Sequence, residues 1–192
     1  AGDLEAKYWQ HYHQKVGRSG VSVEAAKTTV HTNATVMAGL LVDMGEVDGM
    51  ICGKVGRFDR HLKHLSGFIQ PSRPSGVLSS ICALLLEDGP LIIADPFVNV
   101  DPTEDEIVTI AQDAIEYAKR FDIVPRVALL SHSNFGTYED ASALKMKQAA
   151  AQLRGLRPDV QIDGEMHSLS ALNPQLRDTI FEHNQIDGRA NV

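Results

Sequence analysis

The sequence predicts an α/β fold in which helices flank a layered, mixed and mostly parallel sheet. Apolar runs of strand length alternate with longer stretches in which apolar residues recur every three or four positions, as in amphipathic helices. The pair Asp88-Gly89 joins two apolar runs, 77–86 and 90–94, which predicts an antiparallel hairpin within an otherwise parallel arrangement. Polar residues follow several of the runs, and open sheets of this class bind ligands at the carboxyl ends of their strands.

The central element is the apolar run 127–130, which leads directly into a polar turn and a helical pattern that starts near Tyr138. One interpretation is an ordinary connection between a strand and a helix. The other is an anion site, because a helix N-terminus offers unpaired N–H groups and a glycine lets a ligand approach the backbone closely. The candidate ligand-binding residues of this turn are Ser131, Asn134, Gly136 and Thr137.

The remaining elements follow from spacing, capping residues and chain breakers. We expect helices over 6–16, 22–45, 59–69, 103–121, about 138–153 and 174–181, and strands over 47–52, 77–86, 90–94, 127–130 and 160–163. Thr103 and Glu106 have the spacing of a capping box. We expect two parts: residues 1–46 as a helical segment that joins a missing N-terminal lobe, and residues 47–192 as an α/β lobe truncated at its C-terminus.

The composition of the 192 residues is that of a globular protein, with 43% hydrophobic and 22% charged residues. A net charge of −7 argues against a nucleic-acid partner or an anionic membrane surface. Cys52 and Cys82 lie in apolar runs and are more typical of core residues in a reducing compartment than of a disulfide. With no membrane-spanning run and no signal peptide, we expect a cytoplasmic protein.

Cationic residues gather around the end of the predicted strand 47–52 and in the next helix, at Arg57, Arg60 and Lys63. They either form a solvated helix face or clamp phosphate groups, which arginine binds bidentately. His61 and His64 lie three residues apart, but no carboxylate has a matching spacing, so the sequence predicts no metal site.

Carboxylate and amide groups follow two other strands, as Asp95 and Asn99 and as Asp163 and Glu165. A carboxylate at a strand end often only accepts bonds from backbone N–H groups, and this alternative stays open for Asp95 and Asp163. Right-handed crossovers would bring these loops, the turn after 127–130 and the cationic loop to one edge. Such a cleft would suit an acyl phosphate, a phosphate or the pyrophosphate of coenzyme A.

Several short motifs run in order along the chain: YWQHYH from Tyr8, DPFVNVDP from Asp95, SHSNFG from Ser131, DGEMH from Asp163 and GRANV from Gly188. With these motifs the sequence resembles the phosphate acetyl/butyryltransferase family. It is most similar to the phosphotransacetylase-like branch that lies C-terminal to a malic enzyme domain in large bacterial NADP-dependent malic enzymes. That family moves an acetyl group between coenzyme A and phosphate without a metal, and its decisive serine, arginine and aspartate lie in a segment that follows the GRANV motif.

The resemblance implies a regulatory, oligomeric module that binds acetyl-CoA or coenzyme A, while NADP and a divalent metal would bind only in the malic enzyme domain of the same polypeptide. That parent protein would oxidatively decarboxylate malate to pyruvate. The alternative is an active phosphate acetyltransferase. Two departures weigh against it: Asn134-Phe135-Gly136-Thr137 replaces a Thr-Lys-Gly-Ser-like turn, and Asp95-Pro96-Phe97-Val98-Asn99 replaces Asp-Thr-His-Val-Asn. We therefore expect no acyltransferase activity from these 192 residues alone and assign no catalytic residue.

Overall fold

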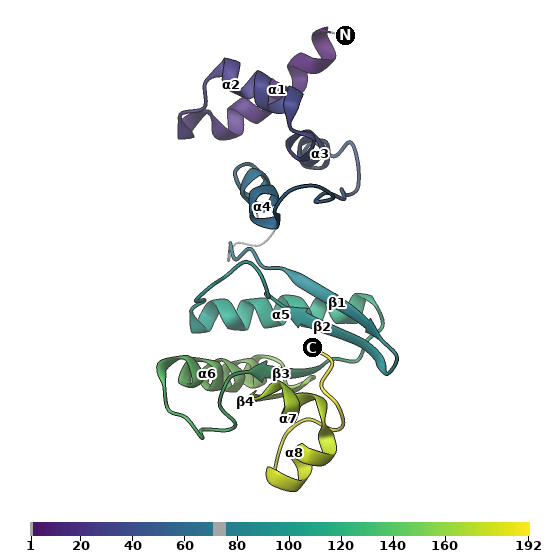
Figure 1. Cartoon of the computed structure of the whole chain (residues 1–192), viewed down its shortest axis with the longest axis vertical. Helices are drawn as coiled ribbons and strands as arrows, with labels where there is room; N and C mark the ends of the chain where they lie inside the picture. Colours follow the sequence, from purple (N-terminus) through teal and green to yellow (C-terminus); the bar gives the residue numbers. More distant parts are fainter. Residues whose placement is uncertain (1, 71–75) are drawn as a thin grey trace. The chain divides into compact units, whose positions relative to one another are not determined.

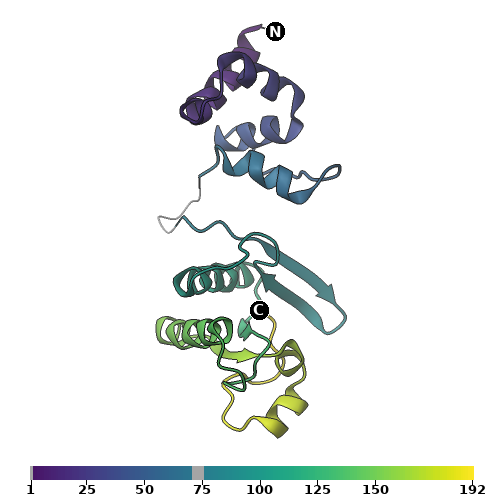
Figure 2. The same cartoon turned by 60° about the vertical axis from the view of Figure 1, so that its left-hand side comes forward.

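The computed structural model describes residues 2–70 and 76–192, and the chain forms two compact units, Ala1–Ser72 and Arg73–Val192 (Figures 1 and 2). The division falls in segment 71–75, outside the described residues, whereas the sequence suggested a boundary after residue 46. Each unit has its own buried core, as a folding unit requires.

Unit 1 is helical. Its elements are α1 (Gly2–Val16), the 3₁₀ turn η1 (Gly17–Ser19), α2 (Val23–Thr32), α3 (Ala34–Asp43) and α4 (Phe58–Ser66). Its core joins aromatic residues of α1 to α3 and to the segment after α4. Tyr12 and Phe68 pack edge to face with ring centroids 5.6 Å apart, and Leu40 is fully buried beside them. The aromatic spacing of the first helix therefore serves packing.

Two expectations for unit 1 were wrong. The helix expected over 22–45 is two helices, because Asn33 has an extended conformation and its side chain accepts hydrogen bonds from the N–H groups of Thr35 and Val36. The strand expected over 47–52 is absent, and Ile51 is fully exposed. A strand needs a neighbour for its N–H and C=O groups, and the described part of unit 1 offers only helices.

Unit 2 is an α/β unit, which confirms the predicted class. Its elements are β1 (Ile81–Leu86), β2 (Gly89–Ala94), α5 (Glu104–Arg120), β3 (Arg126–Leu130), α6 (Ala141–Leu156), β4 (Gln161–Met166), α7 (Ser168–Leu172) and α8 (Pro174–Ile180). The capping box at Thr103 and Glu106 is confirmed. Helix α7 is an element that the sequence reasoning missed.

The strands of unit 2 form two separate pairs. The hairpin at Asp88-Gly89 is confirmed, with Cys82 opposite Ile93 in an antiparallel pairing, and β3 pairs with β4 in parallel. The expected single mixed sheet is thus two two-stranded sheets in the described part of the chain. The two pairs are separate because β2 and β3 do not bond to each other: β2 bonds to Asn191, and β3 bonds to both Asn191 and Val192.

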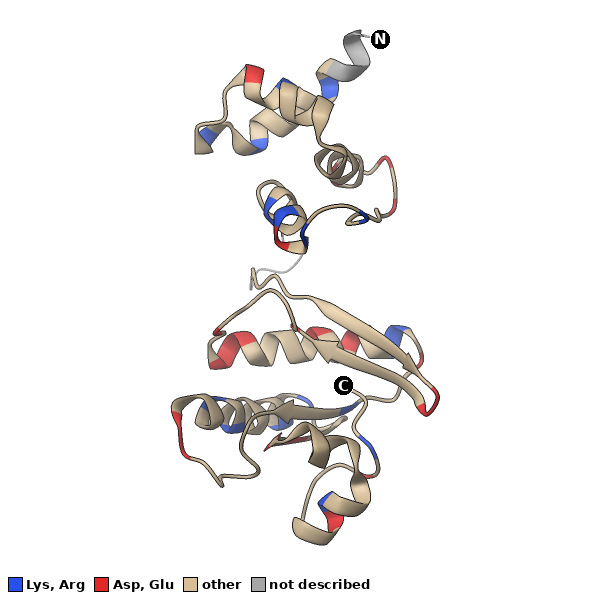
Figure 3. Cartoon of the chain, viewed as in Figure 1, with Lys and Arg blue, Asp and Glu red and all other residues tan. Residues whose placement is uncertain are grey.

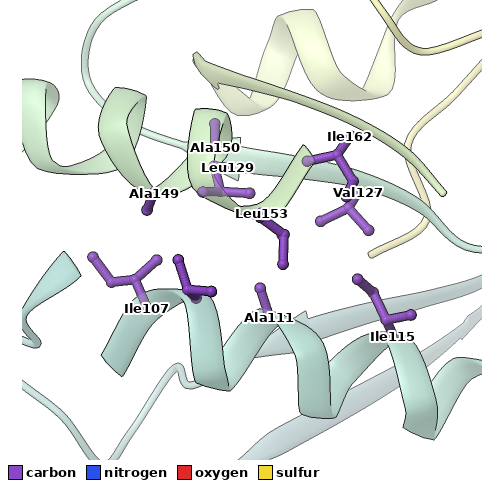
Figure 4. Packing of buried hydrophobic residues seen from close by; sticks show 10 residues of the cluster. Ile107, Ala111, Ile115, Val127, Leu129, Ala149, Ala150, Leu153 and Ile162 are labelled. Carbon is purple, nitrogen blue, oxygen red and sulfur yellow. The ribbon is translucent and has the colours of Figure 1, made fainter. Parts of the chain in front are cut away.

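The main core lies between α5 and the layer formed by α6, β3 and β4 (Figure 4). Ile107, Ala111 and Ile115 repeat every four residues along α5 and face Leu129, Val127 and Leu153. Burial of these side chains fixes β3 against α5 and therefore fixes where the turn after β3 begins.

Two element boundaries near the carboxyl ends of β3 and β4 differ from expectation. Helix α6 begins at Ala141, with Asp140 as its cap, instead of near Tyr138. Strand β4 continues through Gly164 and Glu165, which were expected to lie beyond its end. Within the described residues, no helix has the length and apolar character needed to cross a membrane.

Candidate functional site

The loops that follow β2, β3 and β4 lie on one side of unit 2. The arrows of the three strands point the same way in Figure 1, so their carboxyl ends share an edge. Asn134 links two of these loops, because its Oδ1 accepts hydrogen bonds from the His167 N–H (2.8 Å) and the Ser170 hydroxyl (3.1 Å). Three of the four loops predicted to form a cleft therefore meet at one edge.

The turn after β3 is built around a buried carboxylate from β4. Glu165 Oε1 accepts the Gly136 N–H at 2.6 Å and the Ser133 hydroxyl at 3.0 Å, and the Glu165 carbonyl accepts the Phe135 N–H at 2.8 Å. The Glu165 side chain is 1% exposed, and its Oε2 has no hydrogen-bond partner among the described residues. Burial of a carboxylate oxygen that has no hydrogen-bond partner costs free energy, and other interactions must offset this cost. Here the hydrogen bonds of Glu165 Oε1 offset the cost, because they hold the turn in one conformation.

The other polar groups of this turn also bond within the protein. The Asn134 N–H donates to Thr137 Oγ1 at 3.0 Å, and the Tyr138 N–H donates to Ser133 Oγ at 3.1 Å. Ser131 Oγ accepts the Ser133 N–H at 3.2 Å. Gly136 has a positive φ of 90°, which explains the glycine by backbone conformation. Most N–H groups of the turn therefore donate to acceptors within the protein.

The N-terminus of α6 holds a carboxylate. Asp140 Oδ1 accepts the Ala143 N–H at 2.8 Å, and this bond lowers the pKa of Asp140 below its ordinary value. Partial loss of hydration raises this pKa, and His132 beside the carboxylate lowers it further. A negative charge at a helix start competes with any external anion for the same N–H groups.

The loop after β2 is braced by Asp95, whose φ of 47° is in the left-handed region. Its carboxylate accepts the N–H groups of Asn99 at 2.8 Å and of Ser80 and Val98, both at 3.2 Å. The Asn99 amide donates to Asp95 Oδ2 at 2.7 Å and to the Leu78 carbonyl at 2.9 Å. Both predicted ligand residues thus make structural bonds, as in the backbone-capping interpretation.

Asp163 is nearly as enclosed, at 5% exposure. Its Oδ2 accepts the Gln185 N–H at 2.7 Å, while Oδ1 accepts the Gly164 N–H at 2.9 Å and lies 3.4 Å from Arg154 Nη1. It borders a hollow of about 330 Å³ that Phe135, Phe181 and His183 also line. Asp163 is thus a predicted carboxylate that lies beside a cavity.

The predicted cations belong to unit 1, on and before α4 (Figure 3). Arg57 forms a two-point contact with Asp59, at 2.9 and 3.1 Å, which lowers the pKa of that aspartate. Arg60 and Lys63 are exposed and make no ion pair within residues 2–70 and 76–192. A cleft shared by these cations and the edge of unit 2 stays a prediction.

His61 has a structural role beside these cations. Its Nδ1 lies 2.8 Å from the Thr35 hydroxyl and its Nε2 lies 2.9 Å from the Val55 carbonyl. These two bonds attach the loop before α4 to α3. Among the described residues, no group of three or more His, Cys, Asp or Glu side chains is arranged to hold a metal.

Lys147 is a cation near the turn that the sequence reasoning missed. It comes from α6, is exposed, and its Nζ lies 3.5 Å from the position that a Cβ would take at Gly136. Lys147 could have been identified from the sequence, because it is the seventh residue of the helix that follows Ser131–Thr137.

Comparison with known proteins gives consistent results for family and fold. A family model described as phosphate acetyl/butaryl transferase matches residues 2–192. A phosphotransacetylase from Streptococcus pyogenes superimposes with a TM-score of 0.79 at 26% identity, over 98% of this chain and 56% of that one. A Staphylococcus aureus phosphotransacetylase superimposes with a TM-score of 0.74 at 22% identity, which supports the fold alone.

Curated relatives include both malic enzymes and transferases. An NAD-dependent malic enzyme of Rhizobium meliloti is 42% identical over 96% of this chain, and an NADP-dependent malic enzyme of Escherichia coli is 40% identical over 97%. A phosphate acetyltransferase of Synechocystis is 28% identical over 97%. The chain spans about a quarter of the length of these relatives: 24% of each malic enzyme and 26% of the transferase.

Proposed function

Because the chain belongs to the phosphate acetyl/butyryl transferase family, we propose that it is the acetyl-CoA-binding regulatory domain of a malic enzyme. One observation carries the proposal: identity is 34–42% with four malic enzymes and 28–30% with three phosphate acetyltransferases, while one further malic enzyme is 28% identical. The parent protein would oxidatively decarboxylate malate to pyruvate as a cytoplasmic homo-oligomer. NADP is the proposed coenzyme, although relatives named for NAD and for NADP both occur, and the coenzyme would bind outside these residues.

The proposed ligand matches the unengaged groups of the chain. Acetyl-CoA carries phosphates, and Arg60 and Lys63 are cations without an ion pair in the described part of unit 1. In unit 2, Lys147 adds a positive charge beside Gly136. Hydrogen bonds to charged groups contribute roughly 1.5–3 kcal/mol each. The internally bonded groups of Asp95, Asn99, Glu165 and the turn would then shape the site more than they touch the ligand.

The test is calorimetric titration of acetyl-CoA into the intact parent protein. Arg60→Ala and Asn134→Ala should each weaken binding, with a loss of roughly tenfold or more for the arginine. Arg18→Ala is the matched control, because Arg18 is exposed in unit 1 and outside the predicted site. Melting temperatures would show whether each variant is folded. Unchanged affinity in both test variants would remove these residues from the acetyl-CoA site.

Regulation requires a second measurement. The rate of NADPH formation from malate should change when acetyl-CoA is added to the parent protein, and Arg60→Ala should shift the acetyl-CoA concentration that gives half of the effect. A parent protein that binds acetyl-CoA without any change in malate turnover would show binding without regulation.

An active phosphate acetyltransferase is the second candidate. The observation that favours it is Lys147, which returns a lysine to the turn where the sequence has Asn134-Phe135-Gly136-Thr137. Formation of acetyl-CoA from acetyl phosphate and coenzyme A by the parent protein, abolished by Lys147→Ala but not by Lys145→Ala, would support this candidate over a purely regulatory domain.

A further inference from the structure

The hollow beside Asp163 lies between the turn after β3 and the segment that follows α8. Phe135 lines it from the turn, Asp163 from β4, and Phe181, Glu182 and His183 from the segment after α8. Its volume of about 330 Å³ is at the lower end of the roughly 300–1,000 Å³ that ligand pockets occupy in proteins. The hollow therefore has room for a small molecule.

The segment after α8 is fixed by a buried arginine. The Arg177 side chain is fully buried, and its Nε donates to Asn184 Oδ1 at 3.1 Å. Its Nη2 donates to the carbonyls of Ile186 and Gly188, both at 2.8 Å. Because these bonds hold one wall of the hollow in place, a ligand would not have to order this wall when it binds.

Carboxylates make the hollow electrically negative. Asp163 accepts hydrogen bonds from the N–H groups of Gln185 and Gly164 and from the Arg154 guanidinium. A carboxylate can accept about four hydrogen bonds, so one acceptor position of Asp163 stays unused among the described residues. Glu182 adds a second, exposed carboxylate to the lining, whereas Arg154 lies outside it. The hollow should thus attract a cation and repel an anion such as phosphate.

Two aromatic rings form the apolar part of the hollow. Phe135 and Phe181 have ring centroids 4.9 Å apart and ring planes tilted by 57°. The face of an aromatic ring attracts a cation, most strongly where water is excluded. A hard metal ion would instead need several oxygen ligands, and no metal-binding group of three or more His, Cys, Asp or Glu side chains occurs in the described part of the chain. Carboxylates beside rings therefore favour an organic cation.

We propose that this hollow binds a small organic cation, a primary ammonium on a short apolar body. The ammonium would bind at Asp163, and the apolar body would pack against Phe135 and Phe181. This class of ligand is distinct from acetyl-CoA, whose phosphates are anions, so Asp163 would belong to a site of its own. The inference does not require that the chain binds acetyl-CoA.

The hollow shares Phe135 with the turn Ser131–Thr137. The Phe135 N–H donates to the Glu165 carbonyl at 2.8 Å, and its φ of 49° is uncommon for a residue other than glycine. A ligand packed against the Phe135 ring would contact the turn directly, so the Phe135 amide should sense whether the hollow is occupied.

Amide chemical shifts of the 192-residue chain test the proposal. The probe is n-butylammonium chloride, and n-butanol and inorganic phosphate are the neutral and anionic comparisons. The ammonium should shift the amides of Gln185 and Phe135 saturably, with a Kd on the order of millimolar. Butanol should bind at least about tenfold more weakly, and phosphate should leave both amides unshifted. The Ile93 amide of β2 is the internal control. Absence of a saturable shift, equal binding of butanol, or a shift with phosphate would overturn the proposal.

Variants locate the bound cation. Asp163→Asn should weaken butylammonium binding roughly tenfold, and Phe181→Leu, which keeps apolar surface without a ring, roughly threefold. Glu182→Gln changes an exposed side chain and should weaken binding roughly twofold to fivefold even if Asp163→Asn does not fold. Glu87→Gln, in the exposed turn between β1 and β2, is the matched control and should not change the affinity. Melting temperatures would show which variants are folded. Unchanged affinity in the folded variants at Phe181 and Glu182 would overturn the proposal.

Discussion

The turn Ser131–Thr137 and helix α4 both resemble phosphate sites in sequence, but their polar groups are used differently. In the turn, Gly136 and Ser133 donate to the buried Glu165, so the groups that suggested anion binding hold the turn together. On α4, Arg60 and Lys63 reach solvent without an ion pair in the described residues. The polar residues of the turn thus support the fold, whereas the two cations of α4 stay exposed to solvent.

This difference shows that burial decides what a polar residue can do. A hydrogen bond inside the protein contributes about 1 kcal/mol, and its loss costs more when the remaining partner is buried. Substitutions in the turn should therefore lower stability, and substitutions on α4 should leave stability almost unchanged while they alter ligand affinity. The predictions below test this contrast, from the largest expected effect to the smallest.

Glu165→Leu should lower the free energy of unfolding by about 3 kcal/mol, because the Gly136 N–H and the Ser133 hydroxyl lose their buried acceptor. Urea unfolding followed by circular dichroism would measure the loss. Glu165→Gln keeps an acceptor oxygen and should lose less. A leucine variant as stable as wild type would mean that this carboxylate does not hold the turn.

Asp95→Ala should lower the free energy of unfolding by about 2 kcal/mol. It removes the acceptor for Asn99, Val98 and Ser80 and leaves an alanine at a positive φ. Asp95→Asn, which tolerates that φ and keeps one acceptor oxygen, should recover part of the loss in the same urea titration. Equal stability of the alanine and asparagine variants would contradict the bracing role.

Asp140 should give α6 a pH dependence. Its pKa is lowered in the folded protein, so its contribution is present above its ordinary pKa of 3.8 and is lost as the pH falls through the lower folded value. Wild type should therefore lose more stability than Asp140→Asn as the pH is lowered from about 5 through and below 3.8. Urea midpoints at several pH values would measure this difference. Parallel losses in both proteins would exclude Asp140 as a source of acid sensitivity.

Arg60→Ala and Lys63→Ala should change the free energy of unfolding by less than about 0.5 kcal/mol, because both side chains are exposed. Thermal unfolding of the two variants would measure the change. A loss above about 1 kcal/mol would show that α4 uses these charges for folding, and the contrast with the turn would disappear.

Sequence patterns within a few residues determined much of the fold. Asp88-Gly89 predicted the hairpin, and Thr103 with Glu106 predicted the start of α5, because both signals act locally. The order of the short motifs was also enough to predict the family. Asn33 is a local signal of the same kind that was missed, since its capping bonds reach only two and three residues along the chain.

Only the tertiary structure decided which polar residues are free and which strands have partners. Glu165 lies 29 residues from Gly136 in sequence, so no local pattern could reveal their bond or the burial of that carboxylate. The run 47–52 has the composition of a strand but lacks a neighbour in the described part of unit 1, and β2 and β3 are separated by a slot. Pairing and burial depend on contacts between distant segments, and such contacts exist only once the chain is folded.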